Sequence, residues 1–341
     1  MDSKLVTIWN DYSAFATMSK SPKVVGIVVT YQPNVDTLIA VLESSSPQVD
    51  DLVVVDNTPN PNKALLSCCP KLNNLHLVTL GDNLGIAYAH NVGIEWAYDH
   101  HADFVLLLDQ DSCPQLGMVN SLKQALESSS KDQHNPIATG PAYFDPRTGK
   151  HARFMISRYG LPLKDRPDKK GMTGKRSIVS LLISSGTLIA MPHLLKVGGK
   201  RTEYFIDNVD TEWCLRVRSR GYSIVGVYDA MMEHTLGDEV RHVWFFHHRY
   251  ISIHSPLRYY YIFRNTLLML GDVEIGPIWR LFFIYRLFQY LIFFMLFSQA
   301  RLPRLRLMFL GISHGLRRIS GRLDPNTGRC TPIPKTKFDP A

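Results

Sequence analysis

The sequence predicts an α/β fold in which a mostly parallel sheet is flanked by helices and followed by a C-terminal helical tail. Short apolar runs rich in β-branched residues alternate with longer helical patterns over the first 110 residues, which is the order typical of a parallel sheet with helices on both faces. Polar residues directly follow these apolar runs. Near residue 272 the composition becomes densely apolar and rich in arginine, and this change predicts the tail.

The expected elements follow one another along the chain. Residues 1–22 form an N-terminal extension without the apolar run of a secretory signal. Buried strands are expected at 24–30, 52–55, 75–80 and 104–108, with helices at 34–46 and 85–100. Beyond them we expect strands at 178–183, 188–191 and 222–228, and a helix at 210–220 that Gly221 ends. The domain so defined spans residues 23–271, and the tail spans 272–341.

Composition limits the class of protein. Of the 341 residues, 45% are apolar and 20% are charged, as in a globular chain. The formal net charge of +8 favours a phosphate-bearing partner, whether nucleic acid, anionic lipid or a nucleotide sugar. The five cysteines include no Cys-x-x-Cys pair, so we expect neither a disulfide framework nor a cysteine zinc site, and a reducing compartment is the simpler interpretation.

Polar residues at the strand ends mark a candidate ligand site. In open α/β sheets ligands bind beyond the carboxyl ends of the strands, and the sequence places Thr30-Tyr31, Asp56-Asn57 and Asp109-Gln110-Asp111 there. Two carboxylates one residue apart can share a hard divalent cation, which can neutralise a diphosphate. Asp-x-Asp triplets also occur in solvated turns, but the position directly after an apolar run favours the metal site.

The segment from Asn83 to Gly93 follows a strand and opens a helix. Its residues Asn83, Gly85 and Asn91 stand where backbone amides at a helix N-terminus favour a phosphate or another polar ligand. The alternative is an ordinary loop in which Asn83 caps the helix.

A second helix start gathers three carboxylates, Asp207, Asp210 and Glu212. One of them can serve as a general base if it reaches the hydroxyl group of an acceptor. Helix capping is the alternative, because Asp and Glu stabilise the first turn of a helix.

Histidine and aromatic-basic residues follow the last predicted strand. His234 is a candidate metal or phosphate ligand, although a lone histidine is more often structural. The run from His254 to Arg264 includes Arg258 and Tyr259 and can hold a phosphate or a sugar ring. Its alternative is the first part of an amphipathic surface helix.

These motifs occur together and in chain order, and they resemble the family 2 glycosyltransferases of the Rossmann-like GT-A fold. The Asp-Gln-Asp form, Ser184-Ser185-Gly186 and the segment 205–216 are similar to the bacterial rhamnosyltransferase branch of that family. The resemblance covers residues 24–265.

The resemblance implies a role for each motif, with Asp210 as the catalytic base. Val209 stands where the family has Glu, so Asp207 stays as the second candidate for the base. Asp109, Asp111 and His234 would hold Mg²⁺ or Mn²⁺. The implied donor-binding residues are Thr30, Tyr31, Asp56, Asn57, Asn83, Gly85, Asn91, Asp109, Gln110, Asp111, Ser185 and Gly186. The implied acceptor or phosphate contacts are Asp207, Glu212, Trp213, Arg258, Tyr259 and Arg264.

The same resemblance implies an inverting transfer of L-rhamnose from dTDP-L-rhamnose to a lipid-linked saccharide, in the biosynthesis of cell-surface polysaccharide of the O-antigen (lipopolysaccharide) type. One alternative is a nucleotidyltransferase, but residues 30–34 lack the Gly-rich basic loop of that class. The other is a basic nucleic-acid-binding protein, which the net charge favours. Because no recognised nucleic-acid motif is present, we expect no nucleic-acid partner.

The tail is expected to lie on the inner face of the bacterial inner membrane rather than to cross it. A spanning helix needs about 20 largely apolar residues, and Arg286 interrupts the apolar stretch. A helix in the interface would let Arg280 and Arg286 reach the lipid headgroups, and the arginines from Arg301 to Arg322 would meet anionic lipid. The alternatives are a tail that packs on the domain and a face buried in a homodimer.

Overall fold

The computed structural model describes residues 21–60, 72–129, 135–165, 175–234, 239–245, 247–297 and 301–340. Residues 1–20, most of the predicted N-terminal extension, lie outside these ranges, as do Cys68 and Cys69.

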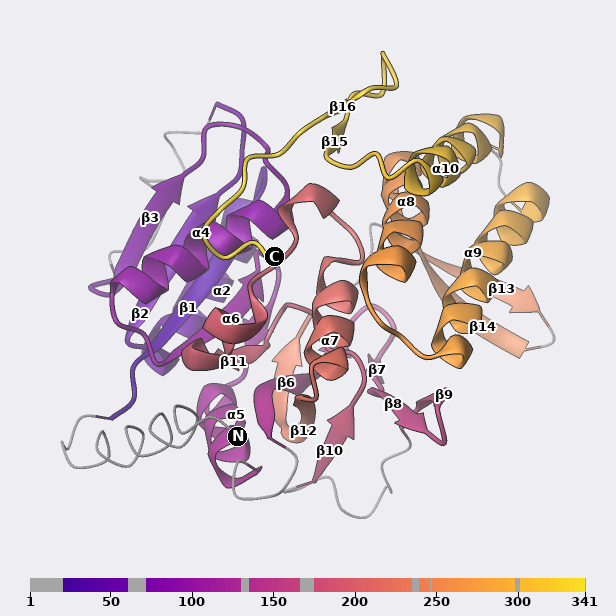
Figure 1. Ribbon diagram of the computed structural model, residues 1–341. Coiled ribbons are helices and arrows are strands. Elements are labelled where there is room, and N and C mark those ends of the chain that lie inside the picture. Colours follow the sequence, from indigo (N-terminus) through magenta and orange to yellow (C-terminus); the bar gives the residue numbers. More distant parts are fainter. Residues whose placement is uncertain are drawn as a thin grey trace, which may run out of the picture.

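A ten-stranded sheet forms the centre of the molecule and confirms the predicted α/β fold (Figure 1). Its strands are β1 (Val24–Thr30), β2 (Asp51–Asp56), β3 (Leu75–Thr79), β4 (Phe104–Asp109), β5 (Cys113–Pro114), β6 (Pro136–Asp145), β7 (Lys150–His151), β10 (Arg176–Val179), β11 (Leu188–Ala190) and β12 (Ser223–Glu233). The main order is β10-β12-β6-β11-β4-β1-β2-β3. β1 pairs parallel with β2 and β4, whereas β11 runs antiparallel between β4 and β6.

Helices cover both faces of the sheet, as strands that are apolar on both sides require. The helices are α2 (Val35–Ser45), α4 (Ile86–Asp99), α5 (Met118–Ser129), α6 (Met191–Val197) and α7 (Val209–Ser219). Alternate residues of β1 and β4 pack into two buried clusters, one shared with α4, α6 and α7 and the other with α2 and α5. Helix α2 begins at its cap, where the Asn34 side chain accepts a hydrogen bond from the Thr37 amide.

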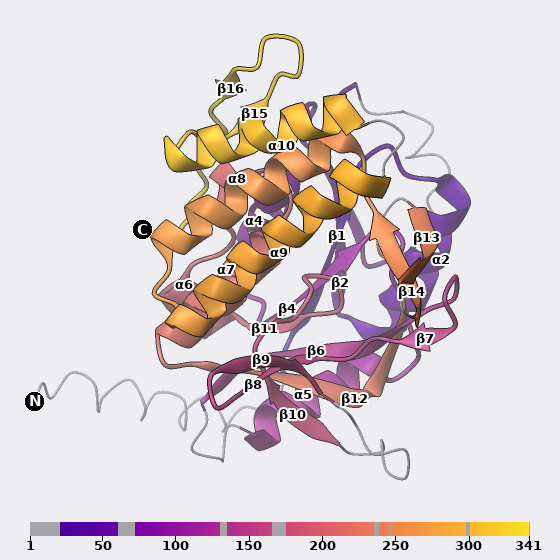
Figure 2. The same ribbon diagram turned by 90° about the vertical axis from the view of Figure 1, so that its right-hand side faces the viewer.

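The C-terminal part adds a group of three helices beside the sheet: α8 (Pro256–Asp272), α9 (Pro277–Phe297) and α10 (Arg301–Leu316) (Figure 2). Two hairpins accompany them, β8 (Met155–Arg158) with β9 (Leu161–Lys164), and β13 (Glu239–Phe245) with β14 (His247–Ile253). Helix α10 packs along α8, and Gly311 allows this because a Cβ atom there would lie 2.5 Å from the Tyr260 carbonyl oxygen. Among the described residues, α9 is the one helix that is long and apolar enough to cross a membrane by length and composition.

The end of the chain returns to the sheet as a strap, which we define as residues 322–340. It includes the short strands β15 (Arg322–Leu323) and β16 (Cys330–Thr331). Phe338 is buried in the core under α4, and the Lys337 ammonium lies 2.8 Å from an Asp99 carboxylate oxygen. The region that the sequence assigns to a separate tail is thus joined to the central domain through α8 and through this strap.

Asn91, a predicted donor contact, holds the strap instead of facing solvent. Its side chain is fully buried in α4. Its Nδ2 donates to the Lys200 carbonyl oxygen (2.8 Å) and to Oγ1 of Thr336 (3.1 Å), and its Oδ1 accepts from the Lys200 amide (2.7 Å). One side chain therefore connects α4, the segment before α7 and the strap.

We expect Asn91→Ala to lower the free energy of unfolding by about 2–3 kcal/mol, because it leaves buried amide and carbonyl groups without partners. Urea unfolding measures the loss. Asn326→Ala is the control, since this side chain is exposed on the strap and its removal should change the stability by about 0.5 kcal/mol at most. Unchanged stability together with weaker nucleotide binding would instead support the donor-contact role.

Candidate active site

The register of the central strands brings the predicted donor residues to one edge of the sheet. Thr30 pairs with Asp56, and Val29 pairs with Asp109, so the ends of three adjacent strands are level. The Thr30 hydroxyl donates to Asp56 Oδ1 at 3.2 Å, and Asp56 is almost completely buried. Gln110 accepts a hydrogen bond from the Tyr31 amide at 2.7 Å, which joins the loops after β1 and β4.

The loop between β3 and α4 contains Asn83 and Gly85, and Asn57, which follows β2, binds it through its side chain. Asn57 Nδ2 donates to Asn83 Oδ1 at 3.1 Å, and Asn57 Oδ1 accepts from the Leu84 amide at 2.8 Å. Gly85 has a φ of +88°, and a Cβ atom there would lie 2.5 Å from the Phe205 carbonyl oxygen. Only glycine therefore lets this loop approach the segment that carries the proposed base.

Asp109, Asp111 and His234 form a group that can hold a metal ion. One ligand atom from each lies within 4.8 Å of the others. His234 Nε2 is 3.9 Å from Asp109 Oδ2, and His234 Nδ1 is 3.5 Å from Asp111 Oδ1. Oδ1 of Asp109 is buried and has no hydrogen-bond partner among the described residues. A hard divalent cation fits this group, because carboxylate oxygens are its preferred ligands and it would satisfy the buried oxygen.

The protonation of this group follows from its burial and its charges. Burial raises the pKa of Asp109 to about 6, and the neighbouring Asp111 and Asp210 add to the increase while His234 opposes it. For His234 burial favours the neutral form, but the hydrogen bond with Asp111 and the two carboxylates outweigh it, so the pKa of His234 is raised. The two carboxylates of the cluster therefore favour a positive charge between them.

Two serines orient the histidine. Ser185 Oγ accepts from the Asp109 amide (3.1 Å) and donates to Ser112 Oγ (2.6 Å), and Ser112 Oγ lies 2.7 Å from His234 Nδ1. Gly186 makes the turn after Ser185 with a φ of +80°, where a Cβ atom would lie 2.4 Å from the Pro141 ring. The sequence pattern identified Ser185 and Gly186 but not Ser112, which directly follows Asp111 and has no feature of its own.

The segment before α7 has an uncommon backbone conformation that α8 maintains. Phe205, Asp207 and Asn208 all have positive φ values, which cost energy in residues other than glycine. Nδ2 of Asn265 lies 2.9, 2.8 and 2.8 Å from the carbonyl oxygens of Tyr204, Ile206 and Asp207. Asn208 Nδ2 donates to Thr266 Oγ1 at 2.9 Å. Helix α8 thus fixes the turn from which Asp210 projects.

The two candidate bases have different surroundings. Asp207 forms an ion pair with Arg258, whose Nη2 lies 2.7 Å from Asp207 Oδ1. Asp210 instead lines a pocket of about 200 Å³ together with Ser185, Tyr143 and Arg153. The pocket connects Asp210 with the serine beside the metal group, so Asp210 is the better placed of the two. Tyr143 and Arg153 were not identified from the sequence, because they lie in a region without a recognised motif.

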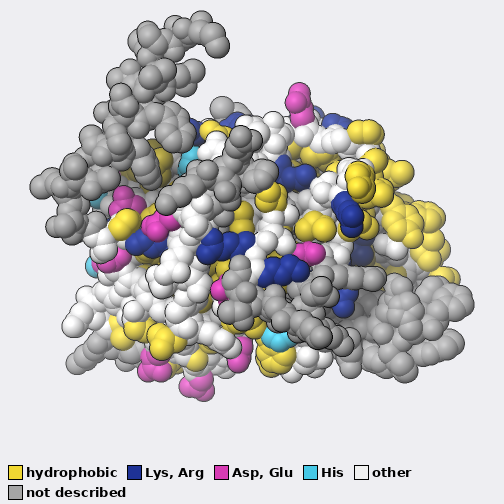
Figure 3. Space-filling model, turned by 90° about the horizontal axis from the view of Figure 1, so that it is seen from below, with side chains coloured by type: hydrophobic (Ala, Val, Ile, Leu, Met, Phe, Trp, Pro, Cys, Tyr) yellow, Lys and Arg dark blue, Asp and Glu magenta, His cyan; other side chains and the backbone are white. Residues whose placement is uncertain are grey.

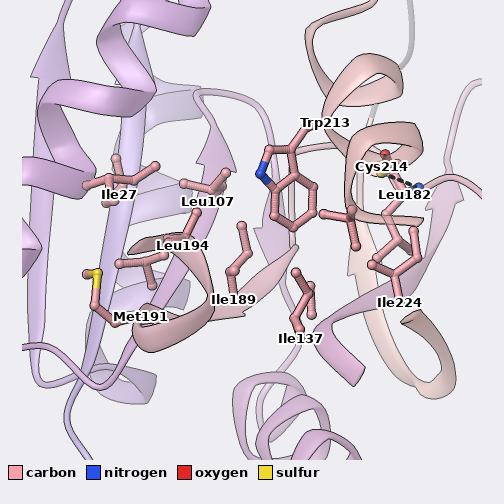
Figure 4. Close-up of a cluster of buried hydrophobic side chains, with 14 of the residues drawn as sticks. Ile27, Leu107, Ile137, Leu182, Ile189, Met191, Leu194, Trp213, Cys214 and Ile224 are labelled. Atoms are coloured by element: carbon pink, nitrogen blue, oxygen red, sulfur yellow. Dashed lines mark hydrogen bonds between the residues drawn. The ribbon is translucent and has the colours of Figure 1, made fainter. Parts of the chain in front are cut away.

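Four predicted acceptor contacts lie inside the protein. Trp213 packs in the core, with its indole between α7 and the sheet (Figure 4). Glu212 is fully buried and binds Arg216 (2.7 Å) and Arg201 (3.0 Å). The other two belong to α8: Tyr259 stacks edge-on against Phe294, and Arg264 donates to the Tyr204 carbonyl oxygen at 3.0 Å. In this structure all four support the loop or the core and none faces the pocket.

A curated relative decides the family of the chain. The dTDP-rhamnosyl transferase RfbF of Shigella flexneri is 34% identical over 245 residues, which cover 72% of this chain and 78% of the relative. The chain belongs to the family 2 glycosyltransferases, in their rhamnosyltransferase branch. No family model matches it. The prediction from the sequence motifs is therefore confirmed at the level of the family and the enzyme class.

Solved structures of other glycosyltransferases share the fold of this rhamnosyltransferase. Residues 1–349 of Staphylococcus aureus TarS, in complex with UDP-GlcNAc, align with a TM-score of 0.53 at 17% identity over 86% of this chain and 81% of that one. GalNAc-T7 with UDP, GalNAc and Mn²⁺ aligns with a TM-score of 0.51 at 14% identity over 64% and 44%. These glycosyltransferases confirm the GT-A fold.

We expect the affinity of the rhamnosyltransferase for Mn²⁺ to fall by more than about tenfold per pH unit below pH 6, because two of the candidate ligands, Asp109 and His234, then carry a proton. The raised pKa of Asp109, about 6, means that the carboxyl is protonated at lower pH, and a bound cation must displace that proton. Titration calorimetry from pH 5 to 7.5 measures the trend. Asp109→Asn should weaken binding and make the profile less steep, because only His234 then titrates. Asp36→Asn, which changes an exposed carboxylate on α2, should alter neither the affinity nor the slope. A profile as steep in Asp109→Asn as in the wild type would exclude Asp109 as the titrating ligand.

Proposed function

We propose that this rhamnosyltransferase moves L-rhamnose from dTDP-L-rhamnose to the sugar hydroxyl of a lipid-linked saccharide, with inversion at the anomeric carbon. The observation that carries this proposal is the pocket that joins Asp210 to Ser185, beside the Asp109, Asp111 and His234 group. The name of the Shigella relative supports the donor. The saccharide would belong to cell-surface polysaccharide of the O-antigen type.

Residues in and around the pocket have different roles in the proposed reaction. The oxygen of the acceptor hydroxyl attacks the anomeric carbon while Asp210 accepts the proton of that hydroxyl. The bond from the anomeric carbon to the diphosphate oxygen breaks in the same step. General-base help of this kind contributes about 10²–10⁴-fold in rate. Asn265 and Arg258 keep the turn before Asp210 in place. Asp56 and Asn57, at the end of β2, would bind the nucleoside of the donor.

Asp109, Asp111 and His234 would hold Mg²⁺ or Mn²⁺, as the buried unpaired oxygen of Asp109 and the oxygen-rich ligand set indicate. When bound, the cation would neutralise charge on the leaving diphosphate. GalNAc-T7 was solved with UDP and Mn²⁺, which is consistent with this assignment. Ser112 and Ser185 fix the orientation of the His234 ring beside the two carboxylates.

The exposed face of α9 supports the proposal that the enzyme works at a membrane surface, where a lipid-linked acceptor would be. This helix exposes a stripe of large apolar side chains at helical spacing, among them Leu281 (67%), Ile284 (51%) and Phe288 (56%). The segment that meets the length and composition criterion for a membrane span, Pro277–Leu296, is only 22% buried. Such a stripe needs an apolar partner, and a membrane surface that also carries the acceptor provides one.

Charge supports a membrane with anionic lipid. The chain has 38 Lys and Arg against 30 Asp and Glu, and eight of these arginines lie between Ile275 and Leu323 with no Asp or Glu among them. The rest of the chain therefore has equal numbers of basic and acidic residues, and the net charge of +8 comes from this segment. We propose that the enzyme binds the cytoplasmic face of the inner membrane as a peripheral protein, because Arg286 lies off the apolar stripe, where it can reach headgroups.

The structure reduces the number of arginines that would face lipid. Arg280 donates to the Leu270 carbonyl oxygen (2.8 Å), Arg318 pairs with Asp272, and Arg322 pairs with Asp82 (2.9 Å). Arg304 stacks on Phe294 inside the helix group. Arg286, Arg306 and Arg317 are exposed and are the arginines we assign to anionic lipid.

Asp210→Asn should lower the rate of transfer from dTDP-L-rhamnose by about 10²–10⁴-fold and leave donor binding unchanged, because it removes only the proton acceptor. The assay is nucleoside diphosphate release with a membrane extract as the acceptor source, and donor affinity is measured by calorimetry with Mn²⁺. Glu233→Gln, an exposed carboxylate on β12, is the control. Near wild-type transfer by Asp210→Asn would move the base to Asp207.

Replacing Leu281, Ile284 and Phe288 together by glutamine should release the protein from the membrane, because three apolar side chains at about 1.5–3 kcal/mol each supply most of the insertion energy. Flotation with vesicles that contain anionic lipid is the measurement. Leu116→Gln is the control, since Leu116 is 89% exposed next to α5 and far from α9 in sequence. If the wild-type protein itself stays in the soluble fraction at low salt, the membrane proposal is wrong, and sedimentation then tests the stripe as a homodimer interface.

A further inference from the structure

The strap also fastens to the loop between β3 and α4, residues 80–85, which we call the donor loop. Arg322 is the first residue of β15. Its Nη1 donates to Asp82 Oδ1 at 2.9 Å and to the Asn83 carbonyl oxygen at 3.1 Å. Asp82 lies 240 residues earlier in the chain, so the return of the strap across α4 brings this cation to the loop (Figure 1).

The donor loop is tied on its other side to the end of β2. The Leu80 amide donates to the Asp56 carbonyl oxygen at 2.9 Å, and Asn83 Oδ1 accepts from Asn57 Nδ2 at 3.1 Å. Asp56 and Asn57 are the residues to which the proposed function assigns the nucleoside of the donor. Asn83 is thus held by its side chain at the nucleoside site and by its main chain at Arg322.

The backbone that carries Arg322 is itself fixed on both sides. The amide of the preceding residue, Gly321, donates to the Glu203 carbonyl oxygen at 2.8 Å. The following residue, Leu323, is buried, and its amide donates to the Tyr261 hydroxyl at 2.9 Å. Arg322 therefore projects from a rigid support, so its ion pair orders fewer free groups than a pair between two flexible surface side chains does.

This ion pair contributes little to the stability of the whole fold. The side chains of Arg322 and Asp82 are 41% and 55% exposed, and exposed pairs are weak. Its effect on a ligand is of another kind, because a loop that is already held in its binding conformation loses less freedom when the ligand binds. The pair is therefore expected to act on donor affinity rather than on unfolding.

We propose that Arg322 is a positioning residue for the donor. Through Asp82 and the Asn83 carbonyl group it holds the donor loop in the conformation that receives the nucleoside, and the end of the chain thereby becomes part of the donor site. This inference rests on the proposed function, since it adds a residue to the same site.

The test measures dTDP binding with Mn²⁺ by calorimetry, and KM and kcat from the release of dTDP from dTDP-L-rhamnose with the membrane extract. Arg322→Gln should weaken dTDP binding by about three- to fivefold and raise KM for the donor by the same factor. It should leave kcat unchanged, because Asn265 still holds the turn before Asp210. A merely structural defect would instead lower the active fraction, and with it kcat, at an unchanged KM.

A matched control is needed because dTDP is an anion, and the loss of any cation weakens its attraction to the protein. Seen from below, Lys and Arg side chains gather across the middle of the face as well (Figure 3). Lys337 is another strap cation in an exposed pair, 2.8 Å from Asp99. Asp99 ends α4, which has 14 residues and is thus about 20 Å long, whereas the donor loop precedes α4. Lys337→Gln should bind dTDP like the wild type.

A double-mutant cycle separates positioning from direct contact. Asp82→Ala should also weaken dTDP binding, and the double variant with Arg322→Gln should lose less than the product of the two single losses, because both changes break one pair. Losses that multiply would mean that Arg322 contacts the nucleotide itself, which would overturn the positioning role. Wild-type dTDP affinity in Arg322→Gln, or an equal loss in Lys337→Gln, would overturn it too.

Failure of the proposed function would look different. The wild type would then release no dTDP from dTDP-L-rhamnose in the presence of Mn²⁺, while the dTDP affinities of the variants would still test Arg322.

Discussion

The parallel pairing of β1 with both β2 and β4 is the constraint on which the active site depends. Because Thr30 is level with Asp56, and Val29 with Asp109, polar side chains leave the apolar sheet at one edge. Burial there raises the pKa of Asp109 to about 6, and its buried Oδ1 has no hydrogen-bond partner in the described part of the chain. An unpaired buried oxygen is costly for the folded protein, and it is the kind of group that a divalent cation satisfies.

The turn before Asp210 depends on a different part of the chain. Positive φ values at Asp207 and Asn208 aim the start of α7 at the pocket, and such a turn persists only when its surroundings over-determine it. Asn265 supplies this support from α8, which α10 covers in turn. Helix α9, which presents the apolar stripe to the outside, packs against both α8 and α10, so the stripe and the turn before Asp210 belong to one packed unit.

The sequence predicted the structure best where the residue types of a segment and its place in the chain both indicate the same element. The apolar runs before Thr30, Asp56 and Asp109 are buried on both sides, so their identity as parallel strands was readable from composition alone. It worked less well between 136 and 240. The strand expected at 178–183 ends at Val179, because the chain then turns toward Gly186, whose φ is +80°. No local pattern marks β6, whose neighbours β11 and β12 come much later in the chain.

The sequence by itself pointed to the family through the resemblance of its motifs, and it determined the strand ends that carry the candidate donor and metal residues and the apolar, acid-free segment at residues 275–323. The strand ends and this segment are local properties of composition and spacing. Only the tertiary structure decided which polar residues face the pocket. Asn91, Glu212 and Arg264 look like ligand contacts in the sequence, yet they are buried and bind backbone or side-chain groups of distant segments. Arg153 has no motif, yet it lines the pocket, because a side chain's partners depend on segments that folding, and not the order of residues, brings together.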